Sequence, residues 1–211
     1  MDNYKTTFDT WNKLAHNYQD KFMDLDLYDD TYNIFCGLIT NPNATVFEIG
    51  CGPGNITKYL LNKRPDFKID ATDVVPNMVK LAQENNPEVM CSVLDCRELN
   101  TVTKKYDAIM CGFCMPYLSK DDCIKLINDA ANILNSGGIL YFSAIEDNYS
   151  KSTYETSSDG QHTMFIYYHE EKYLQAALKT NHFKEVIVKR KHYEKANGTT
   201  STHIIFIAKK E

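Results

Sequence analysis

A glycine-rich turn between an apolar strand and a helix constrains the fold of this chain more than any other feature. Val46 to Ile49 reads as a buried strand, and Asn55 begins a helical pattern. The turn between them is Gly50-Cys51-Gly52-Pro53-Gly54. Glycine has no β-carbon, so the backbone can turn sharply there and a ligand can lie close against it. This arrangement is typical of nucleotide-binding β-α-β units.

The spacing of acidic residues around the turn limits the ligand. Asp73 follows Gly54 by nineteen residues, at the end of the next expected strand, where a carboxylate meets a ribose diol in such units. The turn itself is G-x-G-x-G and not the dinucleotide pattern G-x-G-x-x-G, and Glu48 stands two residues before its first glycine. A carboxylate at that site would repel a pyrophosphate, and it favours a cationic, phosphate-free ligand bearing an ammonium and a sulfonium.

Strand-like and helical patterns alternate through the centre of the chain, which predicts a parallel sheet with helices on both faces. The Ser119 hydroxyl is expected to cap one of these helices, and the helix is expected to stop at Asn135-Ser136-Gly137-Gly138. The expected strands are Thr45–Ile49, Lys68–Thr72, Val89–Val93, Ala108–Cys111 and Ile139–Ala144, and the expected helices are Asn55–Asn62, Pro76–Asn85 and Lys120–Leu134.

The sequence pattern predicts helices before the central alternating region and a β-hairpin after it. Phe8–Phe22 and Tyr28–Ile39 read as aromatic-rich helices, and Glu170–Thr180 reads as a later helix. Strands Lys184–His192 and His203–Lys209 flank Asn197-Gly198, a favoured turn pair. We therefore expect one domain over residues 1–211: an N-terminal helical lid (1–43), a cofactor-binding core (44–145), a variable substrate segment with no clear period (146–169), and a C-terminal helix with hairpin (170–211).

Composition and charge exclude several function classes. The apolar runs are too short to span a membrane, and no signal peptide is visible, so we expect a cytoplasmic protein with no membrane partner. The net charge is −5, whereas nucleic-acid binding favours a basic face. The basic run Lys189-Arg190-Lys191-His192 reads as a solvated strand surface. We expect a small-molecule partner and no nucleic acid, and the oligomeric state stays open.

The seven cysteines indicate free thiols in a reducing compartment. Cys111-x-x-Cys114 resembles half of a metal site, for which Cys91 and Cys96 are the nearby candidates. In the expected sheet these two pairs follow strands that are separated by two others. We therefore predict no metal.

An ordered set of motifs resembles the class I S-adenosylmethionine-dependent methyltransferases from about residue 8 to the end of the chain. The first motif corresponds to Glu48-x-Gly50-x-Gly52-x-Gly54 and the second to Asp73-Val74-Val75-Pro76-Asn77-Met78, where Val75 replaces a common serine. Leu94-Asp95-Cys96 is similar to the third motif. Two further segments match the fourth strand and the loop before the fifth: Tyr106–Cys111 and Leu134–Leu140.

The resemblance implies a Rossmann-like three-layer α/β sandwich with a seven-stranded, mostly parallel sheet of order 3-2-1-4-5-7-6 and strand 7 antiparallel. It implies S-adenosylmethionine as cofactor, with Asp73 on the ribose hydroxyls, Met78 near the adenine and Asp95 accepting from the adenine amino group. The cofactor-binding residues expected on this basis are Tyr18, Glu48, Gly50, Cys51, Gly52, Gly54, Asn55, Asp73, Val74, Met78, Asp95, Cys96 and Cys111.

The methyl acceptor is much less constrained, because methyl transfer needs alignment more than it needs a dedicated catalytic residue. Candidate substrate residues are Trp11, Cys114, Tyr117, Tyr149 and His169. Each has an alternative as a packing or surface residue, as do His162 as a possible base and Tyr154. No catalytic residue is assigned.

The predicted function is transfer of a methyl group from S-adenosylmethionine to an oxygen or nitrogen atom of a small molecule. A non-catalytic protein that binds the same cofactor is one alternative. A nicotinamide-dependent oxidoreductase is another, and Glu48 with the glycine spacing argues against it. Pro116-Tyr117 lacks the Asn-Pro that precedes it in amino-group nucleic-acid methyltransferases, so that activity is not carried over.

Overall fold

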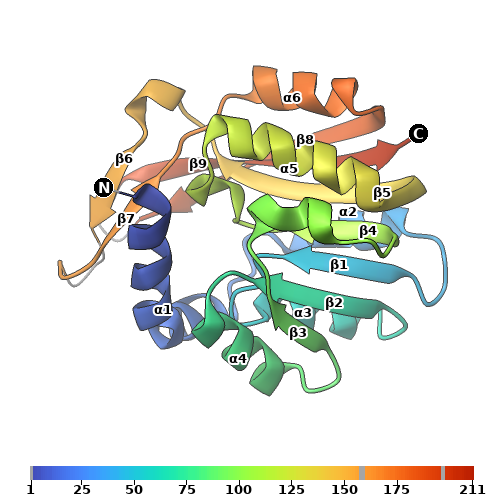
Figure 1. Cartoon of the computed structure of the whole chain (residues 1–211), viewed down its shortest axis with the longest axis horizontal. Coiled ribbons are helices and arrows are strands. Elements are labelled where there is room, and N and C mark those ends of the chain that lie inside the picture. Colours follow the sequence, from blue (N-terminus) through green and yellow to red (C-terminus); the bar gives the residue numbers. More distant parts are fainter. Residues whose placement is uncertain (1, 157–159, 196–197) are drawn as a thin grey trace.

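The computed structural model describes residues 2–156, 160–195 and 198–211. A seven-stranded sheet runs through the molecule with helices on both faces (Figure 1). The helices are α1 (Asn3–Phe22), α2 (Asp29–Leu38), α3 (Asn55–Lys63), α4 (Pro76–Asn85), α5 (Lys120–Ile133) and α6 (Glu171–Thr180), with short 3-10 turns η1 (Cys96–Thr101), η2 (Met115–Tyr117) and η3 (Tyr149–Lys151). The strands are β1 (Thr45–Ile49), β2 (Lys68–Asp73), β3 (Met90–Val93), β4 (Tyr106–Cys111), β5 (Leu134–Ile145), β6 (Thr153–Thr156), β7 (Thr163–Ile166), β8 (Phe183–Glu194) and β9 (Thr200–Lys210).

The main sheet has the order β3-β2-β1-β4-β5-β9-β8. The first five strands are parallel, and β9 is antiparallel to both β5 and β8. β8 and β9 are the strands expected as sixth and seventh, so the predicted order 3-2-1-4-5-7-6 holds within this sheet. Asn197, half of the expected turn between them, lies outside the described residues.

A second, two-stranded sheet, β6 with β7, was not predicted. It falls where the sequence shows a polar stretch without period. Its hydrogen bonds to α1 are non-local: the Thr10 hydroxyl donates to the Thr163 carbonyl at 2.7 Å, and the Phe165 N–H donates to Thr7 Oγ at 3.0 Å. β6, β7 and α1 therefore pack together at the same end of the main sheet (Figure 1).

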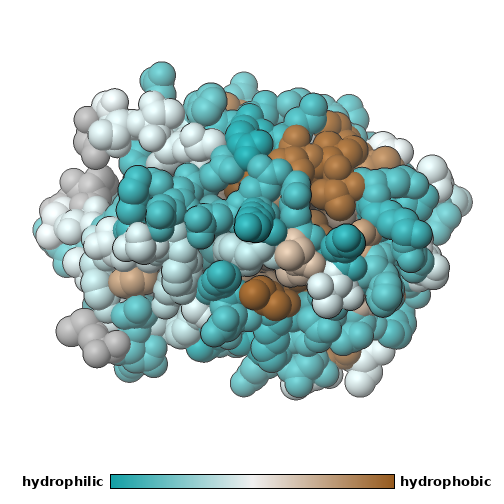
Figure 2. Space-filling view, turned by 90° about the horizontal axis from the view of Figure 1, so that it is seen from above, coloured by the Kyte–Doolittle hydropathy of each residue, from teal (hydrophilic) through white to brown (hydrophobic). Residues whose placement is uncertain are grey.

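Each face of the main sheet has its own core. Alternate strand residues point to opposite faces, so Phe47 and Ile109 pack under α5 and α6, whereas Val46 and Met110 pack under α2 and α3. A smaller cluster joins α1 to α4 through Ala15 and other buried side chains. Seen from above, the molecule is mostly hydrophilic, with one larger hydrophobic area and a few hydrophobic residues scattered elsewhere on this face (Figure 2).

The two ends of α5 differ in how well they match expectation. Ser119 caps α5 as predicted, with its Oγ accepting from the Asp122 N–H at 3.2 Å. The expected end of that helix was wrong: α5 ends at Ile133, and Leu134 already pairs with Tyr106 as part of β5. Gly137 has the expected positive φ, +76°, but it lies inside the irregular start of β5.

Candidate functional site

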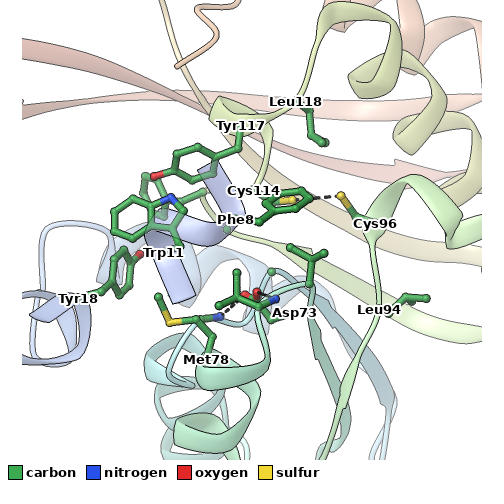
Figure 3. Close-up of a pocket in the computed structure, with 16 residues that line it drawn as sticks. Phe8, Trp11, Tyr18, Asp73, Met78, Leu94, Cys96, Cys114, Tyr117 and Leu118 are labelled. Carbon is green, nitrogen blue, oxygen red and sulfur yellow. Dashed lines mark hydrogen bonds between the residues drawn. The ribbon is translucent and has the colours of Figure 1, made fainter. Parts of the chain in front are cut away.

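A cleft lies at the carboxyl ends of β1, β2 and β4, where open α/β sheets bind ligands. The turn after β1, the end of β2, the segment after β4 and one side of α1 line it (Figure 3). We call it the cofactor cleft. It is lined by Phe8, Trp11, Tyr18, Gly50, Gly52, Asp73, Val74, Val75, Met78, Leu94, Cys96, Gly112, Phe113, Cys114, Tyr117 and Leu118.

The glycine turn needs its glycines. Gly50, Gly52 and Gly54 have φ values of +67°, +54° and +83°, which L side chains rarely adopt. A β-carbon at Gly50 would also lie 3.1 Å from Cys114 Cβ. The turn therefore brings bare backbone to the surface of the cofactor cleft, where a ligand can approach closely.

Asp73 braces this turn from the end of β2. One carboxylate oxygen accepts from the Gly52 N–H at 2.9 Å, and the other accepts from the Val75 N–H at 2.8 Å. The side chain is 8% exposed and lines the cleft, and burial raises its pKa to about 6. Asp73 thus combines a structural role with an acceptor position in the cleft.

Glu48 lies beneath the turn and does not line the cleft, although a carboxylate facing the ligand was expected. Its Oε2 accepts from the Thr57 hydroxyl at 2.6 Å, while Oε1 is buried without a partner among the described residues. Burial raises its pKa to about 8. Glu48 is therefore mostly protonated at pH 7 and does not supply the negative charge that was expected to face the ligand.

Three aromatic side chains of α1 cover the cleft. Phe8, Trp11 and Tyr18 project from α1 toward the side of Asp73 and Met78 (Figure 3). They leave a volume of about 80 Å³, whereas ligand pockets typically measure roughly 300–1,000 Å³. In this structure the cofactor cleft is therefore narrower than a typical ligand pocket.

Asp95 forms an ion pair with Arg97 and does not line the cofactor cleft. Its carboxylate pairs with Arg97, both Arg97 Nε contacts measuring 3.0 Å, and the Arg97 guanidinium lies over the Tyr4 ring at 4.1 Å. Leu94 and Cys96 on either side of it do line the cleft. The proposed contact of Asp95 with an adenine amino group therefore requires this ion pair to rearrange.

Two thiols meet in the cleft although the strands before them are far apart in the sheet. Cys96 begins η1 and Cys114 follows β4, and their sulfur atoms lie 3.5 Å apart. The strands before them are separated by two others, as expected, but η1 turns back toward β4 and brings the two sulfur atoms together. Within the described ranges, no group of three or more His, Cys, Asp or Glu side chains is arranged to hold a metal ion.

A second cavity of about 500 Å³ adjoins the cofactor cleft. Trp11, Tyr18, Phe113 and Tyr117 line both, so the two share a wall. We call it the acceptor cavity. Its other lining residues are Lys21, Phe22, Leu25, Tyr28, Tyr32, Asn55, Pro116, Ile145, Glu155, Thr156, Met164, Ile166, Tyr193, Lys195, Ser201 and His203.

The structure brings most, but not all, of the predicted site residues to these cavities. Tyr18, Gly50, Gly52, Asp73, Val74, Met78 and Cys96 line the cofactor cleft, as do the substrate candidates Trp11, Cys114 and Tyr117. Asn55 lines the acceptor cavity instead. Cys51, Gly54 and Cys111 support the turn and β4 without lining either cavity.

Two substrate candidates lie outside both cavities. His169 is fully buried, with Nε2 donating to the Met115 carbonyl at 2.9 Å and Nδ1 bonded to the Tyr173 hydroxyl. Burial lowers its pKa to about 4. The Tyr149 ring stacks on Tyr167. Both residues therefore fasten the segment after β5 and do not reach a ligand.

Several cavity residues were missed in the sequence. His203 and Lys195 belong to the β8–β9 hairpin, Tyr28 precedes α2, and Glu155 lies on β6. Because β9 is antiparallel, its first residues lie at the edge where the parallel strands end, and His203 pairs with Ile145 at the end of β5. That reversal was predictable and would have drawn attention to His203.

Comparison with known proteins supports this reading of the site. Residues 46–138 match the methyltransferase domain family. A putative methyltransferase 235L of Invertebrate iridescent virus 6 is 31% identical over 139 residues, which is 66% of this chain and 50% of that protein. A malonyl-[acyl-carrier protein] O-methyltransferase of Acetivibrio thermocellus is 33% identical over 102 residues, 46% of this chain and 34% of that protein. The chain thus spans half or less of the length of these two relatives.

Structural similarity extends over more of the chain than these sequence matches. A magnesium protoporphyrin IX methyltransferase from Synechocystis PCC 6803 with bound SAM superposes with a TM-score of 0.70 at 16% identity, covering 100% of this chain and 98% of that one. At this identity the match shows the fold. Relatives also include proteins named as a tRNA methyltransferase and a release factor glutamine methyltransferase. The fold, the glycine turn and the matched segment together identify residues 46–138 as a methyltransferase domain, and the solved structures that share the fold include S-adenosylmethionine-dependent methyltransferases.

Proposed function

We propose that this protein transfers a methyl group from S-adenosylmethionine to an oxygen or nitrogen atom of a small molecule. The observation that carries the proposal is the shared wall of the two cavities, formed by Trp11, Tyr18, Phe113 and Tyr117. Because these residues line both cavities, a donor in the cofactor cleft and an acceptor in the adjoining cavity would lie next to each other. Bringing two reactants together in this way accounts for much of catalysis in such reactions.

The cofactor cleft has the groups that S-adenosylmethionine would need. The backbone at Gly50 and Gly52 can lie against the ligand, the Asp73 carboxylate can accept from ribose hydroxyls, and Met78 can pack against the adenine. When bound, the cofactor supplies the methyl group from its sulfonium. The protein's part is to hold both partners and keep water out.

The size of the acceptor cavity supports a small acceptor. About 500 Å³ lies within the range of small-molecule sites, and Ile145, Met164 and Ile166 are apolar residues of its lining.

We also keep the division into a lid (1–43), a core (44–145), a substrate segment (146–169) and a C-terminal part (170–211) as a proposal. No helix among the described residues is long and apolar enough to cross a membrane. The seven free cysteines support a reducing compartment such as the cytoplasm.

The test is turnover with methyl-labelled S-adenosylmethionine and a panel of acceptors, with Asp73→Ala as the control. The panel contains small phenols, carboxylic acids and amines, together with bulk tRNA and a malonyl-loaded acyl-carrier protein. Label transfer to a small molecule supports the proposal. Transfer to tRNA or carrier protein alone contradicts the acceptor class, and cofactor binding without any transfer favours the non-catalytic alternative.

A further inference from the structure

The acceptor cavity has an aromatic wall. Of the twenty described residues that line it, eight are Trp, Tyr or Phe, whereas these types make up 12% of the chain. They are Trp11, Tyr18, Phe22, Tyr28, Tyr32, Phe113, Tyr117 and Tyr193. Aromatic faces and edges pack favourably against another planar ring, so the wall favours a planar ligand.

One polar pair stands out within this wall. The Tyr28 hydroxyl lies 2.7 Å from His203 Nδ1, and the two residues are 3% and 7% exposed. The His203 ring is nearly parallel to the Tyr193 ring, at 5.6 Å between centroids and 15° between planes. Burial, with a contribution from Lys195, lowers the pKa of His203 to about 4. The imidazole is therefore neutral at pH 7.

The Tyr28 contact fixes which ring nitrogen of His203 carries the proton. Burial raises the pKa of Tyr28, so its hydroxyl stays protonated. Among the described residues that hydroxyl has no acceptor other than His203 Nδ1, so it donates there, and the imidazole proton sits on Nε2. Nε2 has no hydrogen-bond partner in the described ranges. It is also absent from the fully buried polar atoms without a partner, which are Trp11 Nε1 and Glu48 Oε1. The His203 N–H is thus accessible and available to a ligand.

The charges around the cavity favour an anionic ligand group. Lys195 and Glu155 pair with each other at 2.8 Å, so the one carboxylate among the described lining residues is already neutralised. Lys21 also lines the cavity, and its ammonium lies 5.0 Å from the Phe22 ring centre without an acidic partner among the described residues. Among the described residues, the exposed Lys21 ammonium and the His203 Nε2–H therefore line the same aromatic cavity without a protein partner of their own.

We propose that the acceptor cavity selects a planar aromatic acid, whose carboxylate accepts a hydrogen bond from His203 Nε2 while Tyr28 holds the imidazole in the donating tautomer. This rests on the proposed function, because it assigns the acceptor class of the same site. His203 is here an acceptor-binding residue, and no proton transfer is assigned to it.

A matched set of probes tests the proposal on the full chain saturated with S-adenosylhomocysteine. The probes are 2-naphthoate, its decahydro analogue and 2-naphthylmethylamine, and binding is measured by calorimetry. They separate planarity from charge, because the second keeps the carboxylate without the flat ring and the third keeps the flat ring with a cation. We expect 2-naphthoate to bind at least about tenfold more tightly than either of the others, a difference of about 1.4 kcal/mol.

Variants test the role of His203 directly. His203→Phe keeps a ring between Tyr28 and Tyr193 but removes the N–H, and we expect at least about a tenfold loss of 2-naphthoate affinity. His203→Gln places an amide N–H near the same position and should recover part of the affinity. His192→Phe is the matched control, because His192 is exposed on the same hairpin and does not line the cavity. It should leave 2-naphthoate binding unchanged.

The outcomes separate this inference from the proposed function. Failure of the wild-type protein to bind S-adenosylhomocysteine would contradict the proposed function itself. Normal cofactor binding with 2-naphthylmethylamine tighter than 2-naphthoate, or with equal binding of the decahydro analogue, would overturn only the aromatic-acid assignment. Wild-type binding decides this even where a variant fails to fold. Equal losses in His203→Phe and His192→Phe would overturn the role of His203.

Discussion

The Asp73 carboxylate holds the Gly52 backbone N–H at 2.9 Å and so connects the end of β2 to the glycine turn after β1. The same carboxylate accepts from the Val75 N–H at the start of α4. One buried side chain therefore fixes three parts of the cofactor cleft. This explains why the motif on β1 and the acidic residue on β2 occur together.

Replacing Asp73 should weaken cofactor binding strongly while the chain still folds. Asp73→Ala removes both backbone contacts and the acceptor in the cleft, and we expect the Kd for S-adenosylhomocysteine to rise at least about a hundredfold, two charge-assisted hydrogen bonds being lost. Asp73→Asn keeps one oxygen and should lose less. Calorimetry on both variants, with circular dichroism to confirm folding, checks this. Wild-type affinity in Asp73→Ala would be incompatible with the proposed cofactor contact.

Cofactor affinity should depend on pH through Asp73. Its pKa is raised to about 6 by burial, so the side chain is ionised above this pH and protonated below it. Protonation removes acceptor capacity toward Gly52 and the ligand, so we expect affinity to be highest above pH 6 and to fall as the pH drops through 6 toward 5. Titrations with S-adenosylhomocysteine across this range measure the effect. Asp73→Asn should be nearly insensitive, and an equal slope in that variant would assign the titration to another group.

Glu48 should destabilise the cofactor-free protein as the pH rises. Its side-chain pKa lies near 4.5 when unfolded and is raised to about 8 in the folded state, first of all by burial. The unfolded chain thus loses this proton first, and stability is lost between about pH 4.5 and pH 8, with no further loss above. Glu48→Gln removes the buried charge and should raise the free energy of unfolding at pH 8 by more than about 1.4 kcal/mol, the equivalent of one pKa unit. Urea denaturation at pH 5 and pH 8 tests this, and a destabilised Gln variant at pH 8 would contradict it.

Two glycines with similar backbone angles should differ in their tolerance of alanine. Gly54 and Gly137 have φ values of +83° and +76°. A β-carbon at Gly54 would lie 2.3 Å from Asn86 Nδ2 and 3.2 Å from Ala82 Cα, whereas one at Gly137 would meet nothing within 4 Å. Gly137→Ala should cost about 1 kcal/mol for the left-handed backbone alone, and Gly54→Ala about 1–3 kcal/mol more for the clash. Urea melts of the two variants make the comparison, and equal losses would mean that the clash is relieved.

The parts of the fold that were predictable rest on local patterns. Three features lie close together in the sequence, and each supports the interpretation of the others. They are the apolar run of β1, the turn at Gly50 to Gly54 and Asp73 at the end of β2. Strand–helix alternation then led to the sheet order, and the reversal of β9 followed from the hairpin. These local patterns were accordingly sufficient to predict Gly50, Gly52 and Met78 as residues of the cofactor cleft.

The unpredicted parts depend on contacts between distant residues. β6 and β7 have four residues each, too short for a periodic signal, and their bonds to α1 join residues more than 150 positions apart. Tyr28 and His203 are separated by 175 positions, and nothing local to either residue indicates the pairing. The sulfur contact between Cys96 and Cys114 likewise depends on how η1 turns back over the sheet.

The most direct test of the central claim uses Trp11, the single tryptophan of the chain, which lines both the cofactor cleft and the acceptor cavity. Its fluorescence should be followed while S-adenosylmethionine, S-adenosylhomocysteine or NAD is added to the purified protein. We predict a saturable change with the first two ligands, none with NAD, and loss of the signal in Trp11→Phe. A saturable change with NAD alone would contradict a methyl-donor site beneath α1 and would favour a nicotinamide-dependent oxidoreductase.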